Sequence, residues 1–427
     1  MNGKSDALGL WTLVALVVSN MIGAGVFTTS GFALGDLGSP WRVLAAWLVG
    51  GLLALCGAFG YGALSRLIPE SGGEYLYLSR AIHPSAGFIA GWISLLAGFT
   101  AAIAYAALTF AVYAAPEGRP AVVASGVILV TVVLHALGVR QGAWVQNAAV
   151  ALKLLLILAF CAFAVFGPGV GFWAGLAEIA GGAYEVPPFS IATFGLSLMW
   201  ISFSYSGFNA AVYLAGEVPT ARDLVPRALV LGTVLTIFIY LALNTVFVLV
   251  PSFGDAAFEG DIAAVAAEAV GGVGMGTVVR AVVALALFTS VSAMVMVGPR
   301  VYAKMADDGL FPSSLRFGGR TPVAAILMQG ALAVAVVWIT GLRELLSYLS
   351  FTLGLSTAAT VAALFVVVRR NPGMAGTLPG FPWAPAIFVV FTLLFAALAA
   401  TVDPWEMLAA VVTIASGGLL YLLVRGR

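Results

Sequence analysis

The stretch that decides the fold is Val18-Ser19-Asn20-Met21-Ile22-Gly23-Ala24-Gly25-Val26-Phe27, which places two glycines in the middle of an apolar run. Glycine weakens a helix and permits positive φ, so this stretch predicts an interruption of the helix that begins near residue 9. A second stretch has the same character: Phe203-Ser204-Tyr205-Ser206-Gly207-Phe208-Asn209-Ala210. We therefore expect two helices that each break near their middle.

The composition indicates a membrane protein. Of the 427 residues, 62% are hydrophobic and 9% are charged, whereas soluble domains are about 25% charged. So few charges cannot cover a surface that faces water, and the net charge of +1 is uninformative. The two cysteines, Cys56 and Cys161, lie in apolar runs without the spacing of a disulfide framework or a metal site. We predict an all-α polytopic membrane protein with no cofactor and no metal.

Twelve apolar runs are candidates to cross a hydrocarbon core, which takes roughly 20 residues per helix. They are 9–33, 41–65, 83–114, 120–138, 145–167, 190–214, 226–250, 274–303, 322–341, 344–368, 381–402 and 405–424. The first has no cleavage site after it, so we interpret it as a span and not as a signal peptide. The run 83–114 exceeds one crossing, and we expect it to begin in the interface or to tilt.

The basic residues gather on one side of these spans. If the N-terminus is inside, 14 of the 19 lysines and arginines fall on the inner side and 4 on the outer side, with Lys153 inside a span. Cytoplasmic loops collect Lys and Arg, so the asymmetry predicts that both termini are cytoplasmic. We expect a multi-pass protein of the cell inner (plasma) membrane.

The two interrupted runs are the first and the sixth, which is the spacing that an inverted repeat of five plus five helices requires. We predict one membrane domain, 1–427, with repeats at 9–167 and 190–368 and two further spans at 381–424. A half-helix N-terminus suits a carboxylate and free carbonyls suit an ammonium, and a zwitterionic α-amino acid presents both. Close packing of helices through small residues is the alternative interpretation of the same glycines.

Four ordered motifs carry a resemblance to a known family. They are Gly23-Ala24-Gly25-Val26-Phe27; Pro69-Glu70-Ser71-Gly72-Gly73-Glu74-Tyr75-Leu76-Tyr77; Gly216-Glu217-Val218-Pro219 through Pro226-Arg227-Ala228; and Arg300-Val301-Tyr302-Ala303-Lys304-Met305-Ala306-Asp307-Asp308-Gly309-Leu310-Phe311-Pro312, followed by Thr321-Pro322. Over nearly its whole length the chain resembles the amino acid–polyamine–organocation (APC) superfamily. The resemblance implies a LeuT-type fold of 12 transmembrane helices, ten in the core plus two. It also implies secondary active transport by alternating access, either proton-coupled or by exchange.

The run Phe203 to Asn209 is similar to the F-x-Y-x-G-x-N run of the L-type amino-acid transporters. The resemblance implies a substrate site at Met21, Ile22, Gly23, Ala24, Gly25, Phe203, Ser204, Ser206, Gly207 and Asn209. It makes Phe203 an aromatic gate, Asn209 a polar contact below the substrate, and the carbonyls near Phe203, Ser204 and Ser206 acceptors for the ammonium. Ala24 departs from the family's usual serine, which removes a hydroxyl. Phe203 could instead be a core or lipid-facing aromatic residue, and Asn209 a helix–helix hydrogen-bonding residue.

A charged side chain at the bilayer centre costs from about 3 to more than 10 kcal/mol, so Lys153 calls for an explanation. Proton-coupled and exchanging members of the superfamily carry a lysine at this place in span 5, where sodium-coupled relatives bind a cation. The resemblance therefore implies that Lys153 replaces the sodium ion and links span 1 to span 8, with Ser290 and Ser292 as candidate partners. Charge replacement without proton movement, or snorkelling to the interface, remain the alternatives.

The 18 acidic residues all fall in loops or at span ends, and no arginine lies at mid-span. A site selective for a charged side chain would offer the opposite charge. We therefore expect a neutral L-amino acid as the small-molecule partner, with a proton as the candidate coupling ion and no nucleic acid. Alternatives are cationic amino acids or small organic amines carried by an antiporter, or a sensor or channel that does not transport.

Two other classes fit the sequence poorly. A major-facilitator protein carries a basic motif in the loop where this chain has Pro69 to Tyr75. A membrane enzyme would need a catalytic or metal-binding motif such as H-E-x-x-H or G-x-S-x-G, and the two histidines, His83 and His135, are far apart. We expect His83 to be interfacial, His135 to be a capped or packed residue, and the protein not to be an enzyme.

Overall fold

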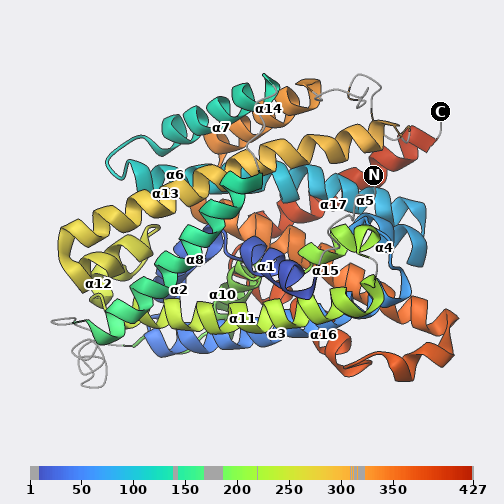
Figure 1. Cartoon of the computed structure of the whole chain (residues 1–427), viewed down its shortest axis with the longest axis horizontal. Helices are drawn as coiled ribbons and strands as arrows, with labels where there is room; N and C mark the ends of the chain where they lie inside the picture. The colour runs from blue at the N-terminus through green and yellow to red at the C-terminus, as the bar shows by residue number, and fades with distance from the viewer. Residues whose placement is uncertain are drawn as a thin grey trace, which may run out of the picture.

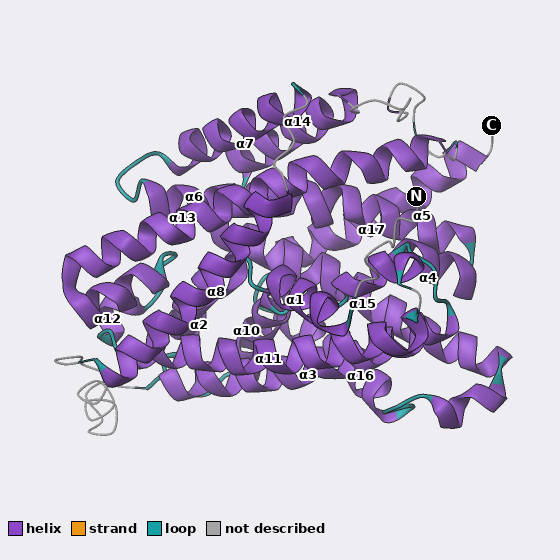
Figure 2. Cartoon of the chain, viewed as in Figure 1, coloured by secondary structure: helices purple, strands orange, loops and turns teal. Residues whose placement is uncertain are grey.

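The computed structural model describes residues 9–137, 143–167, 186–218, 220–307 and 323–425, together with positions 309, 311 and 315. Within this part every regular element is a helix, as Figure 2 shows. The elements are α1 (Leu10–Met21), α2 (Ala24–Leu37), α3 (Pro40–Leu67), α4 (Gly73–Ala81), α5 (Pro84–Ile93), the π-helix η1 (Ser94–Ala101), α6 (Ala102–Ala114), α7 (Pro120–Ala136), α8 (Ala143–Phe166), α10 (Ile191–Ser204), the 3-10 helix η2 (Ala210–Glu217), α11 (Ala221–Leu249), α12 (Phe253–Ala256), α13 (Ile262–Asp307), α14 (Val323–Ile339), α15 (Leu342–Arg370), the 3-10 helix η4 (Pro372–Thr377), α16 (Trp383–Ala399) and α17 (Pro404–Arg425).

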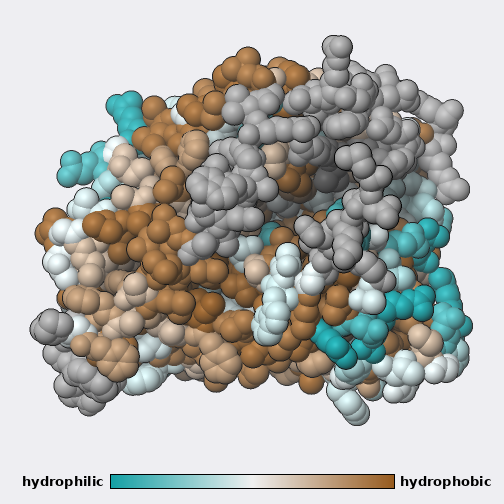
Figure 3. All heavy atoms as spheres, viewed as in Figure 1, coloured by the Kyte–Doolittle hydropathy of each residue, from teal (hydrophilic) through white to brown (hydrophobic). Residues whose placement is uncertain are grey.

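Six of the described helices are long and apolar enough to cross a membrane, and a seventh span is obtained when the bent pair α1 and α2 is counted as one. Five further apolar helices are shorter, between 10 and 17 residues. Large hydrophobic side chains such as Leu155 and Val390 are exposed on the outside of the bundle. In Figure 3 hydrophobic residues cover most of the described face, and hydrophilic residues gather mainly at its right-hand end. This distribution is the one expected of a polytopic membrane protein.

The helices fall close to the spans predicted from the sequence, with two physical differences. The run 83–114 is one helical stretch, α5, η1 and α6, whose middle widens into the π-helix η1. That it begins in the interface or tilts stays a prediction. The run expected at 274–303 belongs to α13, which begins earlier and kinks at Gly271 and Gly272. Gly272 has a φ of 75°, a value that glycine adopts without steric cost.

The long helices lie side by side, with α12 toward one end of the molecule and α4 toward the opposite end (Figure 1). We call these the α12 end and the α4 end. The most extensive helix pair is α3 with α11, followed by α6 with α13 and α1 with α11. The elements α1 and α10 lie near the centre of this arrangement in Figure 1, and the interrupted segments predicted from the sequence follow them directly.

Candidate functional site

The first interruption separates α1 from α2. Helical geometry stops at Ile22, whose ψ is 85°, and Gly23 is extended with a φ of −120° and a ψ of −160°. The two half-helices meet at an angle of 44°. Because the last carbonyls of one helix and the first N–H groups of the next have no partner within their own helix, this break exposes backbone dipoles. The interruption falls at Ile22 and Gly23, and Gly25 already belongs to α2.

The second interruption separates α10 from η2 and covers residues 205–209, which form turns. Gly207 has a φ of 99°, a conformation that favours glycine. The two interruptions touch each other. A Cβ atom at Gly207 would lie 2.9 Å from the carbonyl oxygen of Asn20, and one at Gly25 would lie 2.5 Å from the Ser204 hydroxyl. The missing side chains at these glycines therefore let the broken segments approach closely.

A cavity of about 290 Å³ lies between the interruptions. Its wall includes most of the predicted site residues, namely Met21, Ile22, Gly23, Ala24, Gly25, Phe203, Ser204 and Ser206. The wall also takes residues from the run η1 to α6 and from α13, among them Tyr105, Thr289 and Ser290. No sequence motif around Tyr105 or Thr289 predicts that these residues line the site.

No Asp, Glu, Lys, Arg or His is among the described residues that line this cavity. The hydroxyls of Ser204 and Ser290 and the amide of Asn20 already donate to carbonyls of their own helices, at 3.0 to 3.1 Å. Since a hydroxyl has one proton and two lone pairs, both serines are left as hydrogen-bond acceptors, although Ser204 also bonds to the Thr29 hydroxyl at 2.9 Å and so keeps one free lone pair. Acceptors of this kind suit an ammonium group, while the start of α2 offers N–H groups to an anion.

Tyr240 of α11 ties the two interruptions together. Its hydroxyl lies within hydrogen-bond distance of the Met21 carbonyl and, at 3.0 Å, of the Ser204 carbonyl. The Phe203 carbonyl accepts from the N–H of Ser206 at 2.8 Å. Two of the carbonyls expected to receive an ammonium thus already accept one hydrogen bond from the protein, and each keeps its second lone pair for a ligand.

Phe203 lines the cavity and packs edge-on against Tyr105, with ring centroids 5.6 Å apart. The Tyr105 hydroxyl is hydrogen-bonded to Thr28 of α2. This aromatic pair therefore joins α10 to α6 and α2 beside the cavity. The gating role of Phe203 stays a prediction.

Two predicted site residues in the second interruption lie outside the cavity wall. Gly207 packs against α1 instead, and Asn209, which is 8% exposed, donates from its amide to the Glu74 carboxylate at 2.5 Å. The sequence resemblance suggested a substrate contact for Asn209. The structure gives its amide a protein partner, because η2 turns this residue toward α4.

The predicted coupling residues are separated in the structure. Ser290 lines the cavity, whereas Ser292 is buried behind it and bonds to Nε2 of His135 at 2.8 Å. His135 is accordingly a packed residue, as expected. Lys153 belongs to α8, and its side chain lies outside the described part of the structure.

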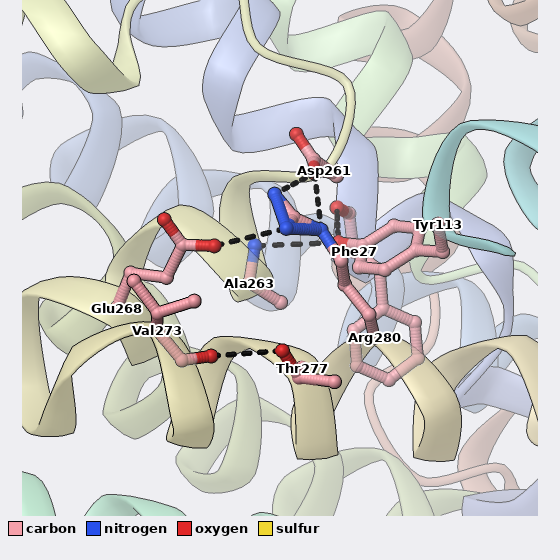
Figure 4. A network of polar contacts seen from close by, with 8 residues as sticks. All are labelled: Phe27, Tyr113, Asp261, Ala263, Glu268, Val273, Thr277 and Arg280. Carbon is pink, nitrogen blue, oxygen red and sulfur yellow. Dashed lines mark hydrogen bonds and ion pairs between the residues drawn. The ribbon is translucent and has the colours of Figure 1, made fainter. Parts of the chain in front are cut away.

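The cavity is closed toward the α12 end by buried groups. Tyr113 of α6 donates to the carbonyl of Phe27 at 2.7 Å and accepts from the N–H of Ala263 at 3.2 Å. Beside it, Arg280 bonds to Asp261 at 2.7 Å and to Glu268 at 2.9 Å (Figure 4). Burial raises the pKa of Asp261, and the guanidinium of Arg280 opposes that rise.

The wall toward the α4 end is less covered. Asn20 is exposed and Gly98 is half-buried, whereas Tyr105 and Gly25, nearer the α12 end, are buried. Asn20, at the end of α1, is thus the only described lining residue that is exposed.

A second cavity, of about 330 Å³, lies between α8, α11 and α13. The residues that line it, such as Phe160, Phe247 and Val279, are all apolar. A zwitterion would find no polar partner there, and burying an unpaired polar group is costly. The first cavity is therefore the candidate site.

Comparisons with known proteins agree with these features. The model of a protein family described as "Amino acid permease" matches residues 8–417. The chain is 27% identical over 402 residues to the serine/threonine exchanger SteT of Bacillus subtilis, which covers 91% of this chain and 90% of that protein. It is 26% identical over 398 residues to the human large neutral amino acids transporter small subunit 2, covering 90% of this chain and 74% of that protein. It is 24% identical over 396 residues to the human Asc-type amino acid transporter 1, covering 90% of this chain and 75% of that protein.

Proposed function

The chain belongs to the amino acid permease family, and we propose that it is a secondary active transporter of neutral L-amino acids that works by alternating access. The observation that carries this proposal is the cavity between the two interruptions, whose described wall combines backbone dipoles with hydroxyl oxygens and has no charged side chain. A permease family is not an enzyme family, so the chain's activity is transport and not catalysis.

In the proposed binding mode the two charges of the substrate meet opposite backbone ends. The carboxylate lies at the start of α2, where the first N–H groups and the positive end of the helix dipole point toward the cavity. The ammonium lies at the carbonyls that end α1 and α10, with the hydroxyl oxygens of Ser204 and Ser290 as additional acceptors. Tyr240 holds the two sets of carbonyls in register.

Selection for an uncharged side chain follows from the same wall. A cationic or acidic side chain would lose its hydration in the cavity without meeting an opposite charge among the described lining residues, and this loss is costly. The names of the relatives support a neutral substrate, because they are a serine/threonine exchanger and a large neutral amino acids transporter. Carriage of cationic amino acids or small amines is the alternative.

For the membrane arrangement we propose 12 spans in a LeuT-type fold, with the α4 end and both termini in the cytoplasm of a cell whose inner (plasma) membrane holds the protein. The 14 basic residues expected inside against 4 outside support this orientation. Support for the two inverted five-helix repeats comes from interruptions in the first and sixth spans, which are five spans apart.

For coupling we propose that Lys153 in α8 takes the place of a bound cation. Its position in an apolar helix supports this, since an intramembrane lysine must have a cavity or a partner. The test is Lys153→Gln, which should lower the initial uptake rate and flatten its dependence on pH. Uptake with an unchanged rate and pH profile would refute the role.

The proposed function is tested with purified protein in liposomes. A thermal-shift screen against the twenty amino acids first identifies ligands, because a ligand that binds only the folded state raises the melting temperature. Counterflow of a labelled ligand against its unlabelled form then tests for a carrier, and a pH gradient separates proton symport from exchange. A ligand that binds without counterflow would instead favour the sensor or channel alternative, and absence of any amino-acid ligand would refute the proposal.

A further inference from the structure

Glu74 is the acidic residue of the loop motif Pro69 to Tyr77 that the proposed binding site leaves unused. It lies in the first turn of α4, and its carboxylate accepts hydrogen bonds from three residues outside that helix. The donors are the hydroxyl of Tyr61 in α3 at 2.8 Å, the amide of Asn209 at 2.5 Å and the hydroxyl of Tyr213 in η2. None of the described ion pairs includes Glu74. The described partners of its carboxylate are therefore neutral hydrogen-bond donors.

The glycines of the motif explain how this contact is made. Gly73 has a φ of 55°, and a Cβ atom there would lie 2.3 Å from the ring of Tyr213. Ser71 adds a further link, because its hydroxyl oxygen accepts from the N–H of Gly216 at 2.9 Å. The loop from Ser71 to Glu74 therefore lies against η2, and any side chain at position 73 would push the two apart.

The contact joins two groups of helices. The helix α4 packs against α5 and α15, whereas η2 packs against α1, α3 and α11. Glu74 is the residue of α4 whose side chain bonds to both α3 and η2. Ser206 lines the cavity, and Asn209 comes three residues after it and two residues after Gly207. A displacement of Glu74 would therefore be transmitted to the second interruption within one turn of backbone.

We infer that Glu74 is a positioning residue for transport, which holds η2 and Asn209 against α3 and α4 while the cavity is open toward the α4 end. The inference rests on the proposed function. In the transport cycle that we infer, closing the cavity at this end moves η2 relative to α4, and the three hydrogen bonds are exchanged in each cycle. Glu74 does not touch the cavity, and its loss should change the rate of the conformational step more than the affinity for substrate.

The experiment compares Glu74→Gln with Glu70→Gln in purified, reconstituted protein. Glutamine keeps the shape but replaces one acceptor oxygen with an NH₂ group that faces donors. Glu70 is a matched control four residues away in the same motif, where it pairs with Arg80 at 3.1 Å on the surface. Two quantities are measured: amino-acid affinity from the melting temperature as a function of ligand concentration, and the initial exchange rate in liposomes at saturating amino acid.

We expect Glu74→Gln to lower the exchange rate at least about tenfold while the dissociation constant changes less than about threefold. Glu74→Asp, which keeps the charge, should recover part of the rate, and Glu70→Gln should match the unmodified protein. Tyr213→Phe removes one donor and serves as a milder variant should Glu74→Gln fold poorly; it should slow exchange about threefold.

An unchanged exchange rate in Glu74→Gln would overturn the inference, and so would a fall in rate matched by an equal loss of affinity. In both cases the unmodified protein would still bind and exchange amino acids, so the proposed function would stand. If the unmodified protein neither binds nor exchanges amino acids, the proposed function itself fails.

Discussion

The cavity and the α12 end lie close together along α13 but differ in chemistry. Ala286 lines the cavity, whose described wall carries no charged side chain, and Arg280, six residues earlier and thus about 9 Å along the helix, is held between two carboxylates. Breaking an ion pair whose carboxylate is buried is costly, so these contacts stabilise the conformation in which the α12 end is closed. Backbone dipoles and hydroxyl oxygens bind more weakly and suit a ligand that must enter and leave.

The largest effect should come from crowding the cavity. In Gly25→Ala the new methyl group would lie 2.5 Å from the Ser204 hydroxyl and 3.0 Å from the Ser204 Cα, so the two interruptions must separate. Overpacking costs about 1 to 3 kcal/mol, and we expect initial uptake in liposomes to fall at least about tenfold. Gly126→Ala is the control, because a Cβ atom there meets nothing within 4 Å. Equal uptake by both variants would show that the close approach is unimportant.

The next effect concerns stability at the α12 end. Arg280→Gln leaves the buried carboxylate of Asp261 without its guanidinium partner, and we expect the free energy of unfolding to fall by about 1 to 3 kcal/mol, less than for a fully buried pair because Arg280 is partly exposed. Thermal unfolding measures this loss. Arg280→Lys keeps the charge but cannot bond to both carboxylates as the guanidinium does. Its free energy of unfolding should lie between those of the unmodified protein and Arg280→Gln. A melting temperature equal to that of the unmodified protein would mean that the ion pairs do not stabilise the closed end.

A smaller loss is expected from Tyr113→Phe, which removes the hydrogen bonds to Phe27 and from Ala263. Each is worth about 1 kcal/mol. The same thermal measurement should place this variant between the unmodified protein and Arg280→Gln. Tyr348→Phe, which loses one hydrogen bond, to Thr413 of α17, provides the comparison. A larger loss for Tyr348→Phe would contradict the importance of Tyr113.

The smallest effect is a dependence on pH at the same end. Burial raises the pKa of Asp261 in the folded protein above the unfolded value of about 3.9. The folded state then binds this proton more tightly than the unfolded state, so the contribution of Asp261 to stability is fully present below about pH 4 and falls as pH rises through the raised pKa. The difference in melting temperature between the unmodified protein and Asp261→Asn, followed from pH 4 to 7, should decline with pH. A difference in melting temperature that grows with pH would contradict a raised pKa of Asp261.

The sequence predicts the parts of this molecule that local patterns control. Long apolar runs place the helices, and glycines in the middle of two of them place the interruptions at Ile22 to Gly23 and at residues 205–209. These features depend on hydropathy and on backbone freedom, which are properties of a short stretch. The residues of those stretches that line the cavity were instead predicted from the family resemblance.

The remaining contacts depend on tertiary packing. Tyr240 reaches Met21 across 219 residues, and Glu74 reaches Asn209 across 135, without any local pattern that pairs them. Asn209 bonds to Glu74, which is the kind of contact that the alternative interpretation of this residue expected, and its substrate contact stays a prediction. The π-helix at Ser94–Ala101 has no composition that distinguishes it from the α-helices around it.

The most direct test of the central claim is whether the cavity needs both charges of an amino acid. The ligand found in the thermal-shift screen is compared with its methyl ester, which lacks the carboxylate, and with its N-acetyl form, which lacks the ammonium. Binding through the two interruptions predicts that the amino acid raises the melting temperature and that neither derivative does so at the same concentration. Equal stabilisation by either derivative would contradict recognition of a zwitterion by the backbone of α1, α2 and α10.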